Sequence, residues 1–171
     1  GGGRLAVDML AGRGYQVVAL TGKENESDYL RSLGAAEVML RQNLDLAKIR
    51  PLDSGRWAGA VDNLGGDVLA WIASAMLQGG TIASIGLAAS MKLNTTVAPF
   101  ILRGVSLLGV DSGYIREPYR SGVWQRLAAD LRPPHLASMS RRIAFDELPA
   151  TFEEYIAGRA KGRVVVEVAG G

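Results

Sequence analysis

The sequence has 171 residues, of which 48% are hydrophobic and 21% are charged, as in a single globular domain with a sizeable core. The 19 basic residues are scattered among 17 acidic ones, so the net charge of +2 and the isoelectric point of about 9.1 mark no basic stripe for nucleic acid. The absence of cysteine excludes disulfides and thiolate zinc sites, and a single histidine, His135, argues against a histidine-rich metal site. No stretch approaches the ~20 apolar residues of a membrane span, and no signal-peptide pattern opens the chain, so we expect a cytoplasmic protein.

Hydrophobic periodicity and glycine stops predict strands that alternate with helices along the whole chain. Apolar residues at helical spacing predict a first helix over residues 5–11, and the continuous apolar run 17–20 predicts a buried parallel strand. Further strands are expected at residues 37–40, 57–62, 81–86, 104–110, 140–144 and 162–168, and further helices at 28–33, 43–49, 67–77, 99–102, 118–131 and 149–157. This alternation predicts an α/β fold with a Rossmann-type, doubly wound parallel sheet whose first strand is absent.

Ligands of such a sheet bind outside the carboxyl ends of its strands, so the candidate site is drawn from the residues there. The glycine turn before the first helix is a candidate for the pyrophosphate, which binds unpaired N–H groups at a helix N-terminus. The candidate cofactor-binding residues are Gly1, Gly2, Gly3, Thr21, Gly22, Lys23, Asn63, Gly65, Gly86, Leu87, Gly109 and Val110. Ordinary turn glycines are the alternative explanation, and Asn63 could equally form an Asx-turn.

The end of the second predicted strand indicates which dinucleotide is bound. An Asp or Glu there would accept hydrogen bonds from the ribose 2′-OH of NAD. This chain has Thr21, Gly22 and Lys23 instead. Thr21 offers a hydrogen-bond donor, Gly22 allows a close approach of the backbone and Lys23 provides a cation, and these groups suit the 2′-phosphate of NADP(H). The same residues argue against a methyltransferase-like domain for S-adenosylmethionine, where an acidic residue would be expected. Lys23 could also be a solvated turn lysine.

Other notable side chains have a structural interpretation that we favour. Arg31 could reach the same phosphate but is expected on a solvated helix face, and His135 is expected to be a surface histidine. The aromatic residues Tyr29, Trp57, Trp71 and Trp124 are expected to pack rather than to stack on a ligand. Four arginines could bind a polyanionic substrate tail, although solvated arginines are the preferred interpretation: Arg103, Arg116, Arg120 and Arg126. No nucleophile–base pair is evident, and the catalytic residues stay unassigned.

Several segments resemble the zinc-free quinone-oxidoreductase branch of the medium-chain dehydrogenase/reductase superfamily, and within it the acrylyl-CoA reductase-like subgroup. The segments are VVALTGK (17–23), YLRSLGA (29–35), RWAGAVD (56–62), GGTIASIGL (79–87) and, most specifically, PFILRGVSLLGVDS (99–112). The similarity extends over nearly the whole chain, but the first strand and most of the glycine fingerprint are missing.

The resemblance implies an NADPH-dependent enzyme that transfers a hydride to the β-carbon of an α,β-unsaturated thioester or ketone. It implies that residues 1–135 are an N-terminally truncated NADP-binding domain, and that 136–171 return toward a GroES-like catalytic domain that is absent here. It also implies a homodimer formed through strand 105–110. The alternative hypothesis is a non-catalytic nucleotide-binding or dimerisation module of the same fold, and the physiological substrate cannot be read from the sequence.

Overall fold

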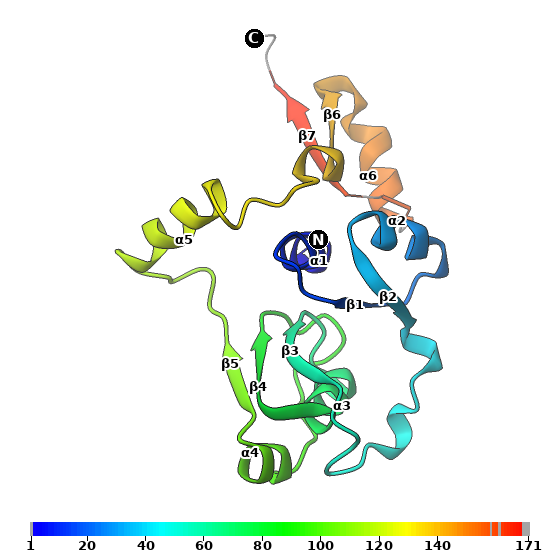
Figure 1. Ribbon diagram of the computed structural model, residues 1–171. Coiled ribbons are helices and arrows are strands. Elements are labelled where there is room, and N and C mark those ends of the chain that lie inside the picture. Colours follow the sequence, from blue (N-terminus) through cyan, green and yellow to red (C-terminus); the bar gives the residue numbers. More distant parts are fainter. Residues whose placement is uncertain (1, 158, 161, 169–171) are drawn as a thin grey trace.

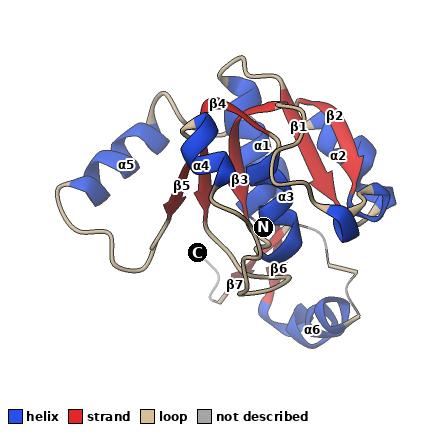
Figure 2. Cartoon of the chain, turned by 90° about the horizontal axis from the view of Figure 1, so that it is seen from below, coloured by secondary structure: helices blue, strands red, loops and turns tan. Residues whose placement is uncertain are grey.

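The computed structural model describes residues 2–157, 159–160 and 162–168, in which strands and helices alternate (Figures 1 and 2). The helices are α1 (Gly2–Gly12), α2 (Ser27–Ser32), α3 (Gly66–Ser74), α4 (Ala98–Arg103), α5 (Tyr119–Ala128) and α6 (Leu148–Ile156). The strands are β1 (Val17–Thr21), β2 (Ala35–Leu40), β3 (Trp57–Asp62), β4 (Met76–Ser84), β5 (Ser106–Gly109), β6 (Ser140–Ala144) and β7 (Arg163–Glu167).

Every ladder between these strands is parallel, which confirms the α/β class. The strands form three separate sheets, with the orders β1-β2, β3-β4-β5 and β6-β7. The predicted single sheet is therefore interrupted, because β1 does not pair with β3. No strand precedes α1 in the described part of the chain, so β1 and β3 have no common neighbour to pair with.

Helix α1 lies on one face of the strands, opposite α3, and contacts β1 and β2 of the first sheet and β3 of the second (Figure 1). Two hydrophobic clusters form the core, one around α1 with β1 and β2, the other between α3 and the second sheet. The first cluster contains Val7, Ala19, Leu30, Leu33, Ala35 and Met139, and the second contains Leu69, Ala73, Met76, Ile82 and Val105. The apolar positions predicted for the first helix and for strand 17–20 thus supply part of the first core.

The boundary between α3 and β4 differs from the prediction of a helix over 67–77. Helix α3 ends at Ser74, and Met76 already pairs with Trp57 of β3. The register then shifts before Gly59 pairs with Thr81. The apolar run that ends α3 and begins β4 is compatible with a buried helix or a buried strand, and only the pairing with β3 distinguishes them.

Helix α5 does not pack as its amphipathic pattern predicts. None of its residues is buried, and the Trp124 side chain is 62% exposed. In both views α5 stands to one side of the sheets (Figures 1 and 2). The prediction of a helix over 43–49 is also wrong, since this part of the chain forms two short 3-10 helices, Arg41–Asn43 and Leu46–Lys48.

Candidate nucleotide-binding site

The carboxyl end of β1 carries the predicted residues Thr21, Gly22 and Lys23. The Lys23 backbone N–H donates a hydrogen bond to Oγ1 of Thr21 (3.1 Å), so the turn after the strand is closed by the threonine hydroxyl. Gly22 and Lys23 are exposed. The structure adds a second cation, because a Cβ at Gly22 would lie 3.5 Å from Nη2 of Arg41.

Arg41 was not among the predicted site residues, although the expected pairing of the two strands indicates its position. Thr21 pairs with Leu40 in the parallel β1-β2 ladder, so the residue after β2 must lie beside the residue after β1. The Gln42 amide donates to Oε1 of Glu24 (3.2 Å) and ties the two loops together. Two cations thus flank a glycine at the end of β1.

The N-terminus of α1 faces the carboxyl end of β3. A Cβ at Gly2 would lie 3.3 Å from Oδ1 of Asn63, and one at Gly3 would lie 3.6 Å from its Nδ2. The first N–H groups of a helix lack intrahelical partners, so they are available to an anion. The structure therefore brings Gly2, Gly3 and Asn63 together, as predicted, while Gly1 lies outside the described residues.

Asp62, the last residue of β3, organises the turn that presents Asn63. Its carboxylate is buried and accepts hydrogen bonds from the backbone N–H groups of Leu64 and Gly65 (both 3.1 Å). It also accepts one from Oγ of Ser84 at the end of β4 (3.3 Å). A carboxylate that orders a turn in this way has no local sequence signal beyond its place at the end of a strand.

Two predicted glycines are explained by contacts within the protein. Gly65 has φ +69° and ψ −160°, and a Cβ there would lie 2.2 Å from the Ser90 carbonyl oxygen. A Cβ at Gly86 would lie 2.6 Å from the carbonyl oxygen of Asn63. The backbone does approach something closely at both positions, but the neighbour is another loop of this chain.

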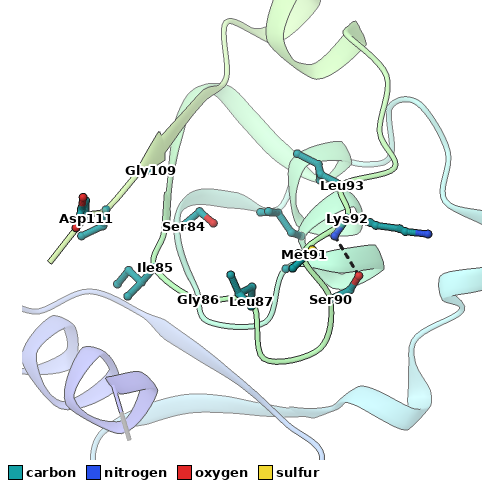
Figure 3. A pocket seen from close by; sticks show the side chains of 13 residues that line it. Ser84, Ile85, Gly86, Leu87, Ser90, Met91, Lys92, Leu93, Gly109 and Asp111 are labelled. Atoms are coloured by element: carbon teal, nitrogen blue, oxygen red, sulfur yellow. Dashed lines mark hydrogen bonds between the residues drawn. The ribbon is translucent and has the colours of Figure 1, made fainter. Parts of the chain in front are cut away.

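These contacts dock the loop of residues 86–93 against the turn after β3. The N–H of Ala89 donates to the Leu64 carbonyl (2.9 Å), and the N–H of Gly66 donates to the Lys92 carbonyl (3.1 Å). The docked loop forms one wall of an open pocket of about 620 Å³ over the carboxyl ends of β4 and β5 (Figure 3). The other side of this pocket is formed by the residues that follow β5.

Five of the predicted residues line this pocket: Gly65, Gly86, Leu87, Gly109 and Val110. Its remaining lining combines apolar side chains with the polar groups of Ser84, Ser90, Lys92 and Asp111 (Figure 3). Thr21, Gly22 and Lys23 do not line it. The predicted set thus falls into three groups, at the end of β1, at the start of α1 and in the pocket.

Contacts between elements hold the three groups along one edge. Asn63 links the start of α1 to Gly86 of the pocket. Arg4 of α1 forms a salt bridge with the buried Glu26 of the loop after β1 (2.7 Å), and its guanidinium lies 4.9 Å from the ring centroid of Tyr29. The edge therefore runs from the β1 end, past the N-terminus of α1, to the pocket.

The arginine cluster suggested by the sequence is dispersed in the structure. Arg103 donates to backbone carbonyls and is not a solvated side chain. Arg126 forms an exposed salt bridge with Asp130 (2.8 Å), and the hydrogen bond from the guanidinium lowers the pKa of that carboxyl below its ordinary value. Arg116 and Arg120 are exposed. The structure assembles no four-arginine anion site.

A metal site finds no support in the residues that the structure describes. They contain no cluster of three or more His, Asp or Glu side chains that could hold a metal ion. The single histidine, His135, is exposed, as expected of a surface histidine, and its ring also forms a hydrogen bond with Asp8 of α1. Among the same residues, no helix is long and apolar enough to cross a membrane.

Comparison with known proteins places this geometry in a family. A sequence profile described as zinc-binding dehydrogenase matches residues 1–129. The acrylyl-CoA reductase AcuI of Ruegeria pomeroyi is 42% identical over 170 residues, which are 98% of this chain and 51% of that protein. This chain thus spans about half the length of the relatives that it matches.

Two solved structures share both fold and sequence. Escherichia coli K-12 YhdH with bound NADPH is 44% identical (TM-score 0.87), and the match covers 99% of this chain and 52% of that one. Bacillus subtilis YhfP with NAD bound is 42% identical (TM-score 0.89), and the match covers 96% and 50%. The described residues provide no cluster of side chains that would hold the zinc ion of the family description. The chain belongs to the zinc-binding dehydrogenase family and has the Rossmann-like fold of its cofactor domain.

Proposed function

We propose that this chain is the cofactor-binding part of an NADPH-dependent oxidoreductase that reduces the C=C bond of an α,β-unsaturated thioester or ketone. Its relatives include an acrylyl-CoA reductase and a protein crystallised with NADPH. Because the chain spans about half of these relatives, the activity would belong to a larger protein or assembly.

The observation that carries the cofactor assignment is the pair of cations at the end of β1. Lys23 and Arg41 flank the exposed Gly22, and no acidic residue follows the strand directly. A ribose 2′-OH is recognised by an acidic side chain, whereas a 2′-phosphate is recognised by cations, with Arg providing bidentate geometry. The site therefore suits NADPH better than NADH, a distinction that matters because YhfP was crystallised with NAD.

The remaining groups would hold the other parts of the dinucleotide. The N–H groups at the start of α1, with the Asn63 amide beside them, would bind the pyrophosphate, and the pocket over β4 and β5 would hold the nicotinamide end. Bound NADPH would supply the hydride to the β-carbon, and the α-carbon would take a proton. The chain's own part is to bind and orient the cofactor, and we assign no proton donor.

We expect Arg41→Ala and Lys23→Ala each to weaken NADPH binding about tenfold to a hundredfold, because a charge-assisted hydrogen bond contributes about 1.5–3 kcal/mol. NADH binding should change less than about threefold, since it has no 2′-phosphate. Calorimetric titration with both cofactors measures this difference. Arg31→Ala, an exposed arginine on α2, is the matched control and should leave both affinities unchanged. Equal loss for the two cofactors would show that the 2′-phosphate lies elsewhere.

The edge of the second sheet supports the homodimer that is expected through strand 105–110. Strand β5 is the last strand of its sheet, and its Leu108 is 54% exposed. Exposed apolar side chains of α4, Ile101 and Leu102, add to this surface. An exposed apolar edge strand is a template for pairing with another strand. We propose that a second copy of this chain pairs with β5.

We expect the protein to sediment as a dimer and Leu108→Glu to raise its dissociation constant at least about tenfold, because a carboxylate would be desolvated at the paired edge. Ile156→Glu on α6, an apolar position that is even more exposed, is the control. Sedimentation velocity across a concentration series distinguishes the variants. A wild-type protein that stays monomeric at high concentration, or equal effects of both substitutions, would exclude pairing through β5.

A further inference from the structure

The first turn of α1 carries an arginine that is directed to the loop after β1. Nη2 of Arg4 donates to Oε2 of Glu26 (2.7 Å), and the guanidinium lies 4.9 Å from the ring centroid of Tyr29. The side chains of Arg4 and Glu26 are only 18% and 4% exposed. A buried carboxylate is costly unless it is paired and hydrogen-bonded, so the guanidinium stabilises Glu26 in its charged form at this position.

The side of Arg4 that faces away from this loop packs against the C-terminal part of the chain. Arg4 and Leu5 line a small cavity of about 40 Å³ together with Ser140, Gly162 and Arg163. A cavity of this size holds no more than about two water molecules, so it is no ligand site. Arg163, the other cation of this lining, is exposed. The Arg4 side chain is thus enclosed between the C-terminal segment and the buried carboxylate.

The buried carboxylate belongs to the loop that carries the predicted 2′-phosphate site. Glu26 is the last residue of the short 3-10 helix that begins at Glu24, directly after Lys23. The backbone N–H of Glu26 donates to the carbonyl oxygen of Lys23 (3.2 Å). At the other end of this helix, Glu24 accepts the hydrogen bond from Gln42, the neighbour of Arg41 in the sequence. One short helix therefore joins the acid to both cations of the candidate site.

A negative charge in this loop affects which dinucleotide binds more tightly. An acidic side chain near the end of β1 accepts hydrogen bonds from a ribose 2′-OH, whereas a 2′-phosphate carries about two negative charges and is repelled by a carboxylate. An uncompensated Glu26 would therefore favour NADH over NADPH. The guanidinium of Arg4 supplies the opposite charge within hydrogen-bond distance, so the pair has no net charge.

We propose that Arg4 is a positioning residue for cofactor choice, which maintains the preference for NADPH by neutralising Glu26. This role rests on the proposed function, because it concerns the discrimination between NADPH and NADH. Arg4 acts through the charge of Glu26 and is not itself a ligand of the 2′-phosphate. The ratio of the two cofactor affinities reports this role, since a merely structural contact would change both affinities together.

Calorimetric titration with NADPH and NADH at about pH 8, where carboxylates are ionised, tests the proposal. We expect Arg4→Met to lower the ratio of NADPH affinity to NADH affinity at least about fivefold, because it leaves the Glu26 carboxylate uncompensated. Glu26→Gln alone should not lower the ratio. The double variant Arg4→Met/Glu26→Gln should restore the ratio to within about twofold of the wild-type value, because it contains neither charge of the pair.

Arg163→Met is the matched control, since it removes an exposed cation beside the same cavity and should leave both affinities unchanged. If Arg4→Met does not fold, Arg4→Gln replaces it, because the amide still donates to the carboxylate but carries no charge.

Three results would overturn the proposal. Equal loss of both affinities in Arg4→Met would show that Arg4 supports the fold or the pyrophosphate site. A ratio lowered as much by Glu26→Gln as by Arg4→Met, or a double variant without recovery, would show that the bond rather than the charge matters. A wild-type protein that does not prefer NADPH would instead overturn the proposed cofactor itself.

Discussion

Gly65→Ala is expected to lower the free energy of unfolding by ~4 kcal/mol and to weaken dinucleotide binding at least about tenfold. The backbone at Gly65 has φ +69° and ψ −160°, a region that is essentially restricted to glycine. A Cβ there would also lie 2.2 Å from the Ser90 carbonyl oxygen, well inside van der Waals contact. The loop of residues 86–93 would have to move away from the turn after β3, and one wall of the pocket would move with it.

Gly79→Ala is the matched control for this prediction. Gly79 has the same φ of +69°, but a Cβ there would meet nothing within 4 Å. It should cost about 1 kcal/mol, the backbone penalty alone, and leave binding unchanged. Urea unfolding and calorimetric titration of both variants distinguish the backbone penalty at positive φ from the steric clash with the Ser90 carbonyl oxygen. Equal destabilisation by the two substitutions would mean that the contact between Gly65 and Ser90 does not hold the loop.

Arg103→Ala is expected to lower the free energy of unfolding by about 3 kcal/mol, because the guanidinium donates charged hydrogen bonds to three carbonyls. Nη1 donates to the carbonyl oxygens of Ser74 (3.0 Å) and Met76 (2.9 Å), and Nη2 donates to that of Asp53. The carbonyls of Ser74 and Met76 lie where α3 ends and β4 begins, and both residues are buried, whereas Asp53 lies in the loop before β3. The arginine therefore joins α4 to this junction.

Two further variants define the role of Arg103. Arg103→Lys should recover only part of the lost stability, since a single ammonium cannot reproduce the planar array of donors. Arg120→Ala, at an exposed arginine of α5, should change stability by less than about 0.5 kcal/mol. Urea unfolding midpoints at constant slope give the comparison. If Arg103→Ala behaved like Arg120→Ala, the three hydrogen bonds would contribute nothing to the fold.

Local patterns were sufficient for the class of the fold and for the edge on which the candidate site lies. Continuous apolar runs such as 17–20 predicted buried parallel strands, and glycines after those strands predicted close approaches of the backbone. The structure confirms the parallel ladders and brings Gly2, Gly3, Asn63 and Gly86 together. These features follow from residues adjacent in sequence, whose periodicity and chemistry are visible without knowledge of their neighbours in space.

Features that depend on distant partners were misjudged or missed. Met76 belongs to β4 because Trp57 pairs with it, and Trp124 is exposed because α5 meets no surface in the described structure. Arg103, interpreted as solvated, is held by carbonyls more than 25 residues away in sequence. An amphipathic pattern or a charged residue indicates what a side chain can contact, but not which contact the fold provides.

The sequence by itself thus determined the α/β class, the strand ends and the cation at the end of β1, because each is a property of a short segment. The tertiary structure alone decided that Arg41 joins Lys23 beside Gly22, that Gly65 is required by Ser90, and that Asp8 holds His135. Each of these contacts joins segments that are brought together by strand register or by loop docking. Their pairing depends on the free energy of the whole fold, which no local pattern records.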